Sequence, residues 1–460
     1  MIKEIVQSVY LFLWGDLIHI SLPDGSEVGL SLMIILLIPT GLFFSVKTRF
    51  MAVRLIPDML KALKGKRRKK SALSPFQALL VSTATRVGMG NLIGVVVALS
   101  AGGPGAVFWM WLMAVIGAST AFIESTLAQL YKRKDPIYGG YRGGPAYYIH
   151  DYVERKLGRR KRRVLCSSLF AISALICWCG ISQVISNSVA NSFENAFGIP
   201  PIYTTIFLVI IAAFIVLRKD MTVRVLDMLV PVMALCYFGI TAFAIVKNIQ
   251  ALPGVFVRIF EGAFDGKKMM AGGMGVVIMN GVKRGLFSNE AGSGSAPCAA
   301  AAADCECPAQ AGLVQALGVF IDTIVICSCT AFNILLVQTE KYAGLEGMKM
   351  LQKAMEYHIG KMGGPFVAVM LFLFSFSTFL GMLFYARSNV AYLFGDDRKW
   401  QNLYKILSLV MLLIGGLEAY SYVWLLGDIG VGLMTVFNVL FLYLMSNEAI
   451  EELKKYKTEC

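Results

Sequence analysis

Charged residues are scarce in this 460-residue chain. Asp, Glu, Lys and Arg make up 16% of it, against about 25% of a typical soluble domain. Hydrophobic residues make up 57%. A soluble fold of this length has no means of covering so much apolar surface, whereas a lipid bilayer solvates it. The composition therefore excludes an ordinary soluble domain and predicts a membrane-spanning protein.

Motifs that carry catalysis or nucleic-acid binding are also lacking. There is no nucleotide-binding loop, HExxH or GxSxG-type elbow, and only three residues are histidine. Cys305 and Cys307 form a C-x-C pair in a predicted loop, whereas the C-x-C pair Cys177 and Cys179 lies inside an apolar run. We therefore expect a protein that is not an enzyme, with reduced thiols, no organic cofactor, no nucleic-acid partner and no obligate protein partner.

Long apolar runs are what the sequence has instead. Runs of roughly 20 apolar residues recur, which favours an all-α bundle over a barrel of ten-residue alternating strands. We predict a single transmembrane domain over 1–460 with about eleven spanning helices. The predicted spans are 28–46, 76–99, 105–130, 164–190, 202–217, 225–246, 269–291, 313–337, 364–385, 403–417 and 422–445.

Lys and Arg are distributed unequally between alternate loops. The runs 61–70 and 159–163 lie on the same predicted side, together with about thirty of the basic residues, and about nine lie on the other side. Because basic loops stay in the cytoplasm, we predict a multi-pass protein of a bacterial-type inner (plasma) membrane. Its N-terminus lies outside and its C-terminus is cytoplasmic. The run 61–70 is interpreted as a solvated topology determinant.

Two of the predicted spans are interrupted by glycine and polar residues, at 83–94 and at 285–294. An unwound helix frees backbone groups, and these are tolerated in a membrane only around a cavity or a ligand. The ends of the half-helices then present a positive N-terminus to a carboxylate and carbonyl oxygens to a cation. Both interruptions are therefore predicted to border a binding site.

The positions of the interrupted spans indicate an internal repeat. If 28–46 is an extra N-terminal helix, two five-helix halves remain, 76–246 and 269–445, and each begins with an interrupted span. Halves of five spans have opposite orientations, as in inverted-repeat secondary transporters. The alternative is a pair of glycine-rich packing helices. That alternative does not explain why polar residues accompany the glycines at matching places.

Several motifs, in this order, resemble the alanine/glycine:cation symporter family, also called sodium:alanine symporters. They extend over about residues 78 to 394, and they are Gly88–Gly94, Gly102–Trp111, Gly143–Ile149, Arg284–Gly292, Gly294–Pro297 and Val319–Thr323. The resemblance implies a leucine-transporter-type fold with one extra N-terminal helix. It also implies import of a small neutral amino acid by symport with Na⁺ or, less often, H⁺.

The resemblance also implies where the ligands bind. It places the amino acid at Gly88, Gly90, Asn91, Gln183, Phe287, Ser288 and Asn289. It places Na⁺ between the first and eighth core helices, where the hydroxyls of Ser377 and Thr378 face carbonyls near Thr85 and Gly88. Oxygen ligands suit such a hard cation. No other metal is expected. The alternative for the two hydroxyls is a hydrogen bond within their own helix.

Three residues depart from the family's usual pattern. Met89 stands where the family usually has Thr, Met382 where it usually has Trp, and Arg86 where it usually has a small residue. A methionine wall is more adaptable than a tryptophan wall. We therefore count Met89 and Met382 among the substrate-binding residues and expect room for a larger amino acid than alanine.

Ionisable residues within spans are functional candidates because their burial is costly. We assign gating or coupling to Arg86, Glu290, Glu124 and Asp322. Arg86 is interpreted either as a fixed charge that replaces a transported cation or as a side chain that extends to the cytoplasmic surface. Glu290 is expected to orient the unwound backbone, carry a proton or pair with an arginine. Glu124 and Asp322 also fit a role in helix pairing.

The sequence thus favours a cation-coupled amino-acid carrier that works by alternating access around its broken helices. The alternative that we keep is a transporter-like amino-acid sensor or an uncoupled carrier. Such a protein binds an amino acid without accumulating it.

Overall fold

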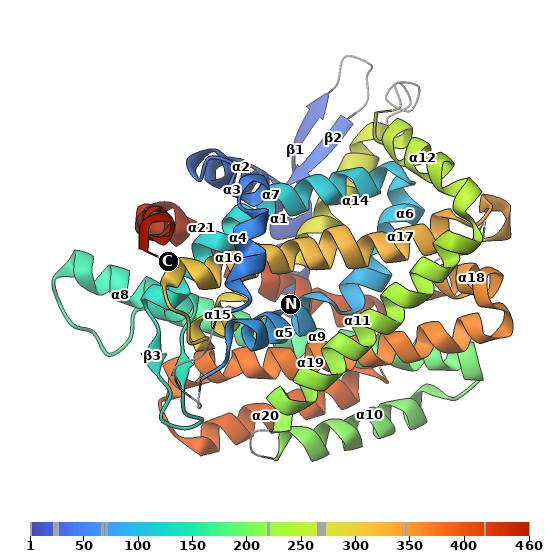
Figure 1. Cartoon of the computed structure of the whole chain (residues 1–460). Coiled ribbons are helices and arrows are strands. Elements are labelled where there is room, and N and C mark those ends of the chain that lie inside the picture. Colours follow the sequence, from blue (N-terminus) through green and yellow to red (C-terminus); the bar gives the residue numbers. More distant parts are fainter. Residues whose placement is uncertain are drawn as a thin grey trace.

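The computed structural model describes residues 2–21, 27–65, 69, 72–218, 221–264, 273–342, 344–345, 347–417 and 420–459. Within these ranges the chain is almost entirely helical (Figure 1). Part of the basic run 61–70, including Arg67 and Arg68, lies outside the described residues.

An N-terminal unit precedes the first interrupted span. It consists of α1 (Ile2–Trp14), the hairpin β1 (Asp16–Ser21) and β2 (Glu27–Ser31), α2 (Leu32–Lys47), α3 (Met51–Arg54) and α4 (Ile56–Ala62). The strands pair antiparallel and project from one end of the molecule (Figure 1). The helix α1 is the one long element of this unit that the sequence did not predict.

The first predicted half, 76–246, begins with a broken pair of helices. Its elements are α5 (Pro75–Arg86), η1 (Gly90–Gly94), α6 (Val95–Gly102), α7 (Gly105–Leu130), β3 (Arg133–Lys134), β4 (Tyr141–Arg142), α8 (Pro145–Leu157), α9 (Leu165–Phe197), α10 (Pro201–Val216) and α11 (Met221–Lys247). A reciprocal capping box between Ser74 and Gln77 starts α5, with Pro75 at the first helical position.

The second predicted half, 269–445, follows η2 (Ile249–Ala251) and α12 (Leu252–Phe264). Its elements are α14 (Gly273–Asn289), α15 (Pro297–Ala302), α16 (Pro308–Val319), η3 (Phe320–Cys327), α17 (Ser328–Leu335), η4 (Thr339–Lys341), α18 (Met348–Ile359), η5 (Gly360–Met362), α19 (Gly363–Phe394), α20 (Arg398–Gly415) and α21 (Tyr420–Glu459). The segments η1 and η3 are π-helical, so each locally widens a span.

Among the described residues, six helical segments are long and apolar enough to cross a membrane, or seven if the bent pair α5 and α6 counts as one. The other predicted spans also fall on helices where the structure describes them, but α2 and α10 are shorter. Residues 269–272 of the predicted span 269–291 lie outside the described residues. In α11 only 28% of the apolar window is buried, against 72% in α7. Large apolar side chains on α10 and α11 are exposed, including Phe207, Ile210 and Leu235. These helices therefore form an apolar outer surface that suits lipid, whereas α7, α9 and α19 form the interior.

Candidate functional site

The first break lies between α5 and α6, whose axes differ by 54°. Val87 has φ −76° and ψ 77°, and the Gly88 amide donates to the Arg86 carbonyl oxygen at 2.8 Å, so an inverse γ-turn ends α5. A Cβ on Gly88 would lie 2.2 Å from Oγ1 of Thr378. The sequence therefore needs glycine here because α19 approaches the break closely.

The second break lies between α14 and α15. The helix α14 runs through Phe287 and Ser288 to Asn289, so the interruption that we predicted over 285–294 begins later, at Glu290. Glu290 has φ 53°, a left-handed conformation that is uncommon for a residue other than glycine. Its carbonyl oxygen accepts hydrogen bonds from the amide and hydroxyl of Ser293. This local turn replaces helical hydrogen bonds.

A cavity lies between the two breaks. Nine of the predicted site residues line it, and they are Thr85, Arg86, Met89, Gly90, Phe287, Ser288, Glu290, Thr378 and Met382. The remaining lining comes mainly from α1, α2, α9 and α21. Residues that are separated by almost 300 positions in the chain thus meet at one internal space, as the interruptions had predicted.

Asp322 joins the two broken spans. Its carboxylate accepts hydrogen bonds from Asn91 Nδ2 at 2.6 Å, Ser288 Oγ at 2.8 Å and Thr323 Oγ1 at 2.8 Å. The Oδ1 atom of Asn91 in turn accepts from the Gly88 amide at 3.0 Å. Asn91 and Asp322 are fully buried and do not line the cavity. Their geometry fastens η1 and α14 to η3.

Glu124 on α7 holds the unwound segment 290–296. Its Oε2 atom accepts from the Gly294 amide at 3.2 Å and from Nδ2 of Asn438 at 2.9 Å. Asn438 also donates to the Gly292 carbonyl at 2.9 Å, and Tyr148 donates to Asn438. A fully buried carboxylate thus replaces helical partners for backbone groups that the break leaves free.

Two predicted substrate residues point elsewhere. The Gln183 side-chain amide contacts Met411 of α20, and Asn289 accepts from the Ala291 amide at 3.0 Å. Neither residue lines the cavity. In this conformation Gln183 packs one helix against another, and Asn289 stabilises the start of the second break.

Ser377 and Thr378 lie where α19 crosses α5. Both hydroxyls donate to the Phe374 carbonyl, about one turn back in their own helix, at 2.8 and 2.9 Å. Both also reach the Ala84 carbonyl, at 3.3 and 3.1 Å. Hydrogen bonding within the helix, our alternative interpretation, is therefore present. The same oxygens nevertheless converge beside the first break.

Arg86 does not extend to the surface. Its side chain is 2% exposed, and Nη1 donates to the Gln315 carbonyl of α16 at 3.1 Å. The interpretation that this side chain reaches the cytoplasmic surface is therefore wrong. The guanidinium turns inward because α16 presents a carbonyl acceptor and the glycine at 318, where a Cβ would lie 2.5 Å from Nη1.

Trp14 is a cavity residue that sequence reasoning missed. Its Nε1 atom donates to the Asp428 carbonyl of α21 at 2.9 Å, and the neighbouring Leu13 is buried against Met33 and Ile429. The signal in the sequence is weak, because α1 is short and polar residues follow it. A single tryptophan after an apolar stretch gives no indication that it lines a cavity.

We expect Trp14→Ala to raise the KM for amino-acid uptake about tenfold. Removal of the ring opens the cavity wall and removes the hydrogen bond from Nε1 to the Asp428 carbonyl, which contributes about 0.5–1.5 kcal/mol. Initial rates of uptake into vesicles measure this. Trp400→Ala is the control, since Trp400 is 41% exposed and stacks on Phe394 outside the cavity. Equal KM values for the two variants would remove Trp14 from the site.

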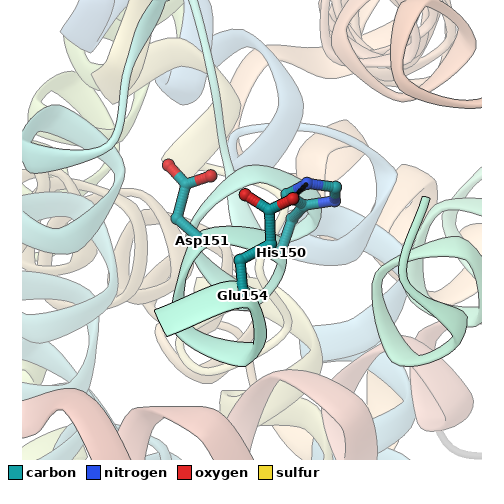
Figure 2. A group of neighbouring side chains, drawn as sticks. All are labelled: His150, Asp151 and Glu154. Atoms are coloured by element: carbon teal, nitrogen blue, oxygen red, sulfur yellow. Dashed lines mark ion pairs between the residues drawn. The ribbon is translucent and has the colours of Figure 1, made fainter. Parts of the chain in front are cut away.

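A group of three side chains on α8 has the spacing of metal ligands. Figure 2 shows His150, Asp151 and Glu154 gathered on this helix, with ligand atoms within 4.8 Å of one another. Each already has a partner: Tyr392 for His150, Arg133 for Asp151, and the Lys161 amide for Glu154. The last bond lowers the pKa of Glu154. The group is thus accounted for by ordinary pairing.

The sequence is also similar to those of known proteins. The sequence model of the sodium:alanine symporter family matches residues 21–460. The probable sodium/glutamine symporter GlnT of Bacillus subtilis is 39% identical, over 92% of this chain and 87% of the relative. The sodium/alanine symporter AgcS of Methanococcus maripaludis is 32% identical, over 98% of this chain and 97% of the relative.

The fold is also similar to that of solved transporters. The manganese transporter of Eremococcus coleocola, solved as a point mutant, matches with a TM-score of 0.53 and 11% identity. The match covers 82% of this chain and 78% of that chain. This likeness concerns the fold alone. The predicted family is confirmed by the sequence matches, whose members are transporters rather than enzymes: the chain belongs to the sodium:alanine symporter family.

Proposed function

We propose that this protein imports a neutral amino acid by symport with Na⁺, or with H⁺, and that the cavity between the two breaks is the substrate site. The observation that carries the proposal is the convergence of both broken spans on one cavity. Relatives named as sodium/glutamine and sodium/alanine symporters support the two ligand classes. Alternating access then moves α5–α6 and α14–α15 relative to the surrounding helices.

The proposed topology has eleven spans, an inverted five-plus-five repeat and one extra N-terminal helix. The helices at all eleven predicted ranges support it, as does the placement of a break at the start of each half. The unequal distribution of Lys and Arg supports an outer N-terminus and a cytoplasmic C-terminus in a plasma membrane.

The cavity wall favours a neutral side chain. Met89 and Met382 line it together with Met33, Met434 and Phe287. Unbranched methionine side chains fill and yield to apolar groups of different shapes. We therefore propose a substrate range that includes alanine and extends to larger neutral amino acids. Gly90 and Ser288 give the substrate access to the backbone of both breaks.

The proposed cation site lies at the crossing of α5 and α19. It uses Thr85, Gly88, Ser377 and Thr378, and the convergence of both α19 hydroxyls on the Ala84 carbonyl supports it. Thr378 also lines the cavity. A cation there lies close enough to the substrate for the binding of each to favour the other.

Thr378→Val tests the cation site. Valine keeps the branched shape but removes the hydroxyl oxygen, so we expect the Na⁺ concentration for half-maximal uptake to rise about tenfold, the effect of about 1.4 kcal/mol. The control is Thr205→Val on α10, where the hydroxyl donates within its own helix. An unchanged Na⁺ requirement in Thr378→Val would place the ion elsewhere.

The buried charges divide into two groups in this proposal. Asp322 and Glu124 couple the breaks to neighbouring helices, since they accept hydrogen bonds from groups on the broken spans and do not line the cavity. Arg86 and Glu290 border the cavity directly. When the broken spans move, the hydrogen bonds of Asp322 and Glu124 must either be replaced by others or move with the spans. We therefore assign these two residues a gating role.

A panel of labelled amino acids offered to proteoliposomes tests the substrate class. The vesicles carry an inward Na⁺ gradient, an inward H⁺ gradient or neither. We expect saturable uptake of alanine and of at least one larger neutral amino acid, stimulated by one of the gradients. Uptake of alanine or glycine alone would contradict the wider range.

A further inference from the structure

Two hydrogen-bond donors of Arg86 have no acceptor among the residues that the structure describes. Nη1 is bonded to the Gln315 carbonyl, but Nε and Nη2 have no partner within the described part of the chain. These two atoms form one side of the planar guanidinium, and that side matches the two oxygens of a carboxylate. A buried cationic donor pair without an acceptor is costly, so its presence in a cavity wall calls for a ligand.

No carboxylate in the described ranges fills this role. Glu290, Glu124 and Asp322 lie near enough for Coulombic attraction to Arg86. However, no ion pair joins Arg86 to any of them among the residues that the structure describes. Asp322 is held by Asn91 and Ser288.

The backbone amide of Gly88, which the family resemblance places at the substrate, already has acceptors. The Gly88 amide donates to Asn91 Oδ1 and to the Arg86 carbonyl oxygen. A carboxylate at this amide would have to displace both acceptors. The free side of Arg86, two residues earlier in the chain, requires no such exchange.

Glu290 supplies the opposite charge in the same cavity. Its Oε2 atom accepts from the Ser295 hydroxyl, and its left-handed backbone places it at the start of the second break. Strained residues of this kind concentrate at ligand sites. Arg86 and Glu290 therefore stand on opposite broken spans and border one cavity without pairing with each other.

We propose that Arg86 and Glu290 bind the two charged ends of a zwitterionic amino acid. The α-carboxylate takes the Nε–Nη2 side of Arg86, the α-ammonium takes Glu290, and the neutral side chain lies among the methionines. Nε and Nη2 are covered in this conformation, so binding includes a shift of the flexible Arg86 side chain toward the cavity. The inference rests on the proposed function and assigns the recognition of the amino-acid head group within it.

Paired variants and truncated ligands test both ends separately. Arg86→Met and Glu290→Gln are assayed for alanine uptake and for its inhibition by alaninamide, which lacks the carboxylate, and by lactate, which lacks the ammonium. We expect each variant to raise the KM for alanine at least tenfold. Arg86→Met should no longer bind alanine in preference to alaninamide, but should keep the parent's preference for alanine over lactate. Glu290→Gln should no longer bind alanine in preference to lactate, but should keep the preference for alanine over alaninamide. Arg86→Lys keeps the positive charge but lacks the paired donors of the planar guanidinium. Its KM for alanine should lie between those of the parent and of Arg86→Met.

The matched control is Arg258→Met. Arg258 also donates to a carbonyl at a helix end, that of Leu335, but lies outside the cavity. Its KM and selectivity should equal the parent's. Arg86→Met with the parent's KM and selectivity, or with a change in Na⁺ dependence alone, would overturn the inference and favour a fixed charge that replaces a cation. Absence of amino-acid uptake by the parent protein would instead overturn the proposed function.

Discussion

Asp322→Asn is expected to reduce amino-acid uptake about a hundredfold while the protein still inserts and folds. The change replaces one carboxylate oxygen with an amide nitrogen that faces donors from Asn91, Ser288 or Thr323. Loss of hydrogen bonds to a charged group costs about 1.5–3 kcal/mol each. The loss of one or two such bonds corresponds to the hundredfold reduction in rate, because we expect transport to need the hydrogen-bonded link between the two breaks. Initial uptake rates, normalised to inserted protein, measure the effect.

Thr323→Val is the control for Asp322→Asn. It removes one of the three donors and leaves both links to the broken spans intact. We expect a clearly smaller reduction than for Asp322→Asn, since Thr323 lies beside Asp322 in the same helix and its hydrogen bond does not join the broken spans. Similar rates for Asp322→Asn and the parent would show that the link between the breaks is not needed for transport.

Gly88→Ala is expected to reduce uptake at least tenfold and to raise the Na⁺ concentration for half-maximal uptake. The added methyl group would lie 2.2 Å from Oγ1 of Thr378, so α19 or the break has to move. Overpacking of this kind costs about 1–3 kcal/mol. It also shifts the hydroxyl that the proposed cation site uses.

Gly90→Ala provides the comparison within the same break. The closest atom to a Cβ there is a ring carbon of Phe287 at 3.7 Å, which is ordinary contact. We expect this variant to keep the parent's Na⁺ requirement. If both alanine variants changed that requirement equally, the loss would reflect helix flexibility at the break and not the approach of Thr378.

The sequence predicted the longest apolar spans well because their signal is local. A run of apolar residues defines a helix in lipid whatever its neighbours are, so the range 105–130 coincides with α7. The apolar criterion is weaker for α2 and α10, which are shorter. The helix α1 was missed because a short apolar stretch followed by Gly15 and Asp16 does not resemble a span.

The cavity was predicted through residue types rather than through geometry. Glycine and polar residues marked both breaks, and Met89, Phe287 and Met382 do line the cavity. The direction of a side chain depends on helix rotation, which depends in turn on packing between distant segments. Gln183 therefore turned out to face α20, and Arg86 turned inward to a carbonyl on α16.

Asn91 shows a further limit of prediction from sequence. Its position in the first break suggested direct contact with substrate, yet its amide is used by Asp322, Ser288 and the Gly88 amide. A polar residue at a break is equally suited to bind a ligand or to satisfy the backbone that the break exposes. Only the three-dimensional partners separate the two uses.

The most direct test of the central claim is uphill accumulation. Purified protein is reconstituted into vesicles with labelled alanine at equal concentration inside and outside, and an inward Na⁺ or H⁺ gradient is then imposed. A cation-coupled carrier predicts that internal alanine rises above the external concentration and returns to it when an ionophore collapses the gradient. Saturable alanine binding without any rise under either gradient would contradict the account and indicate a sensor or an uncoupled carrier.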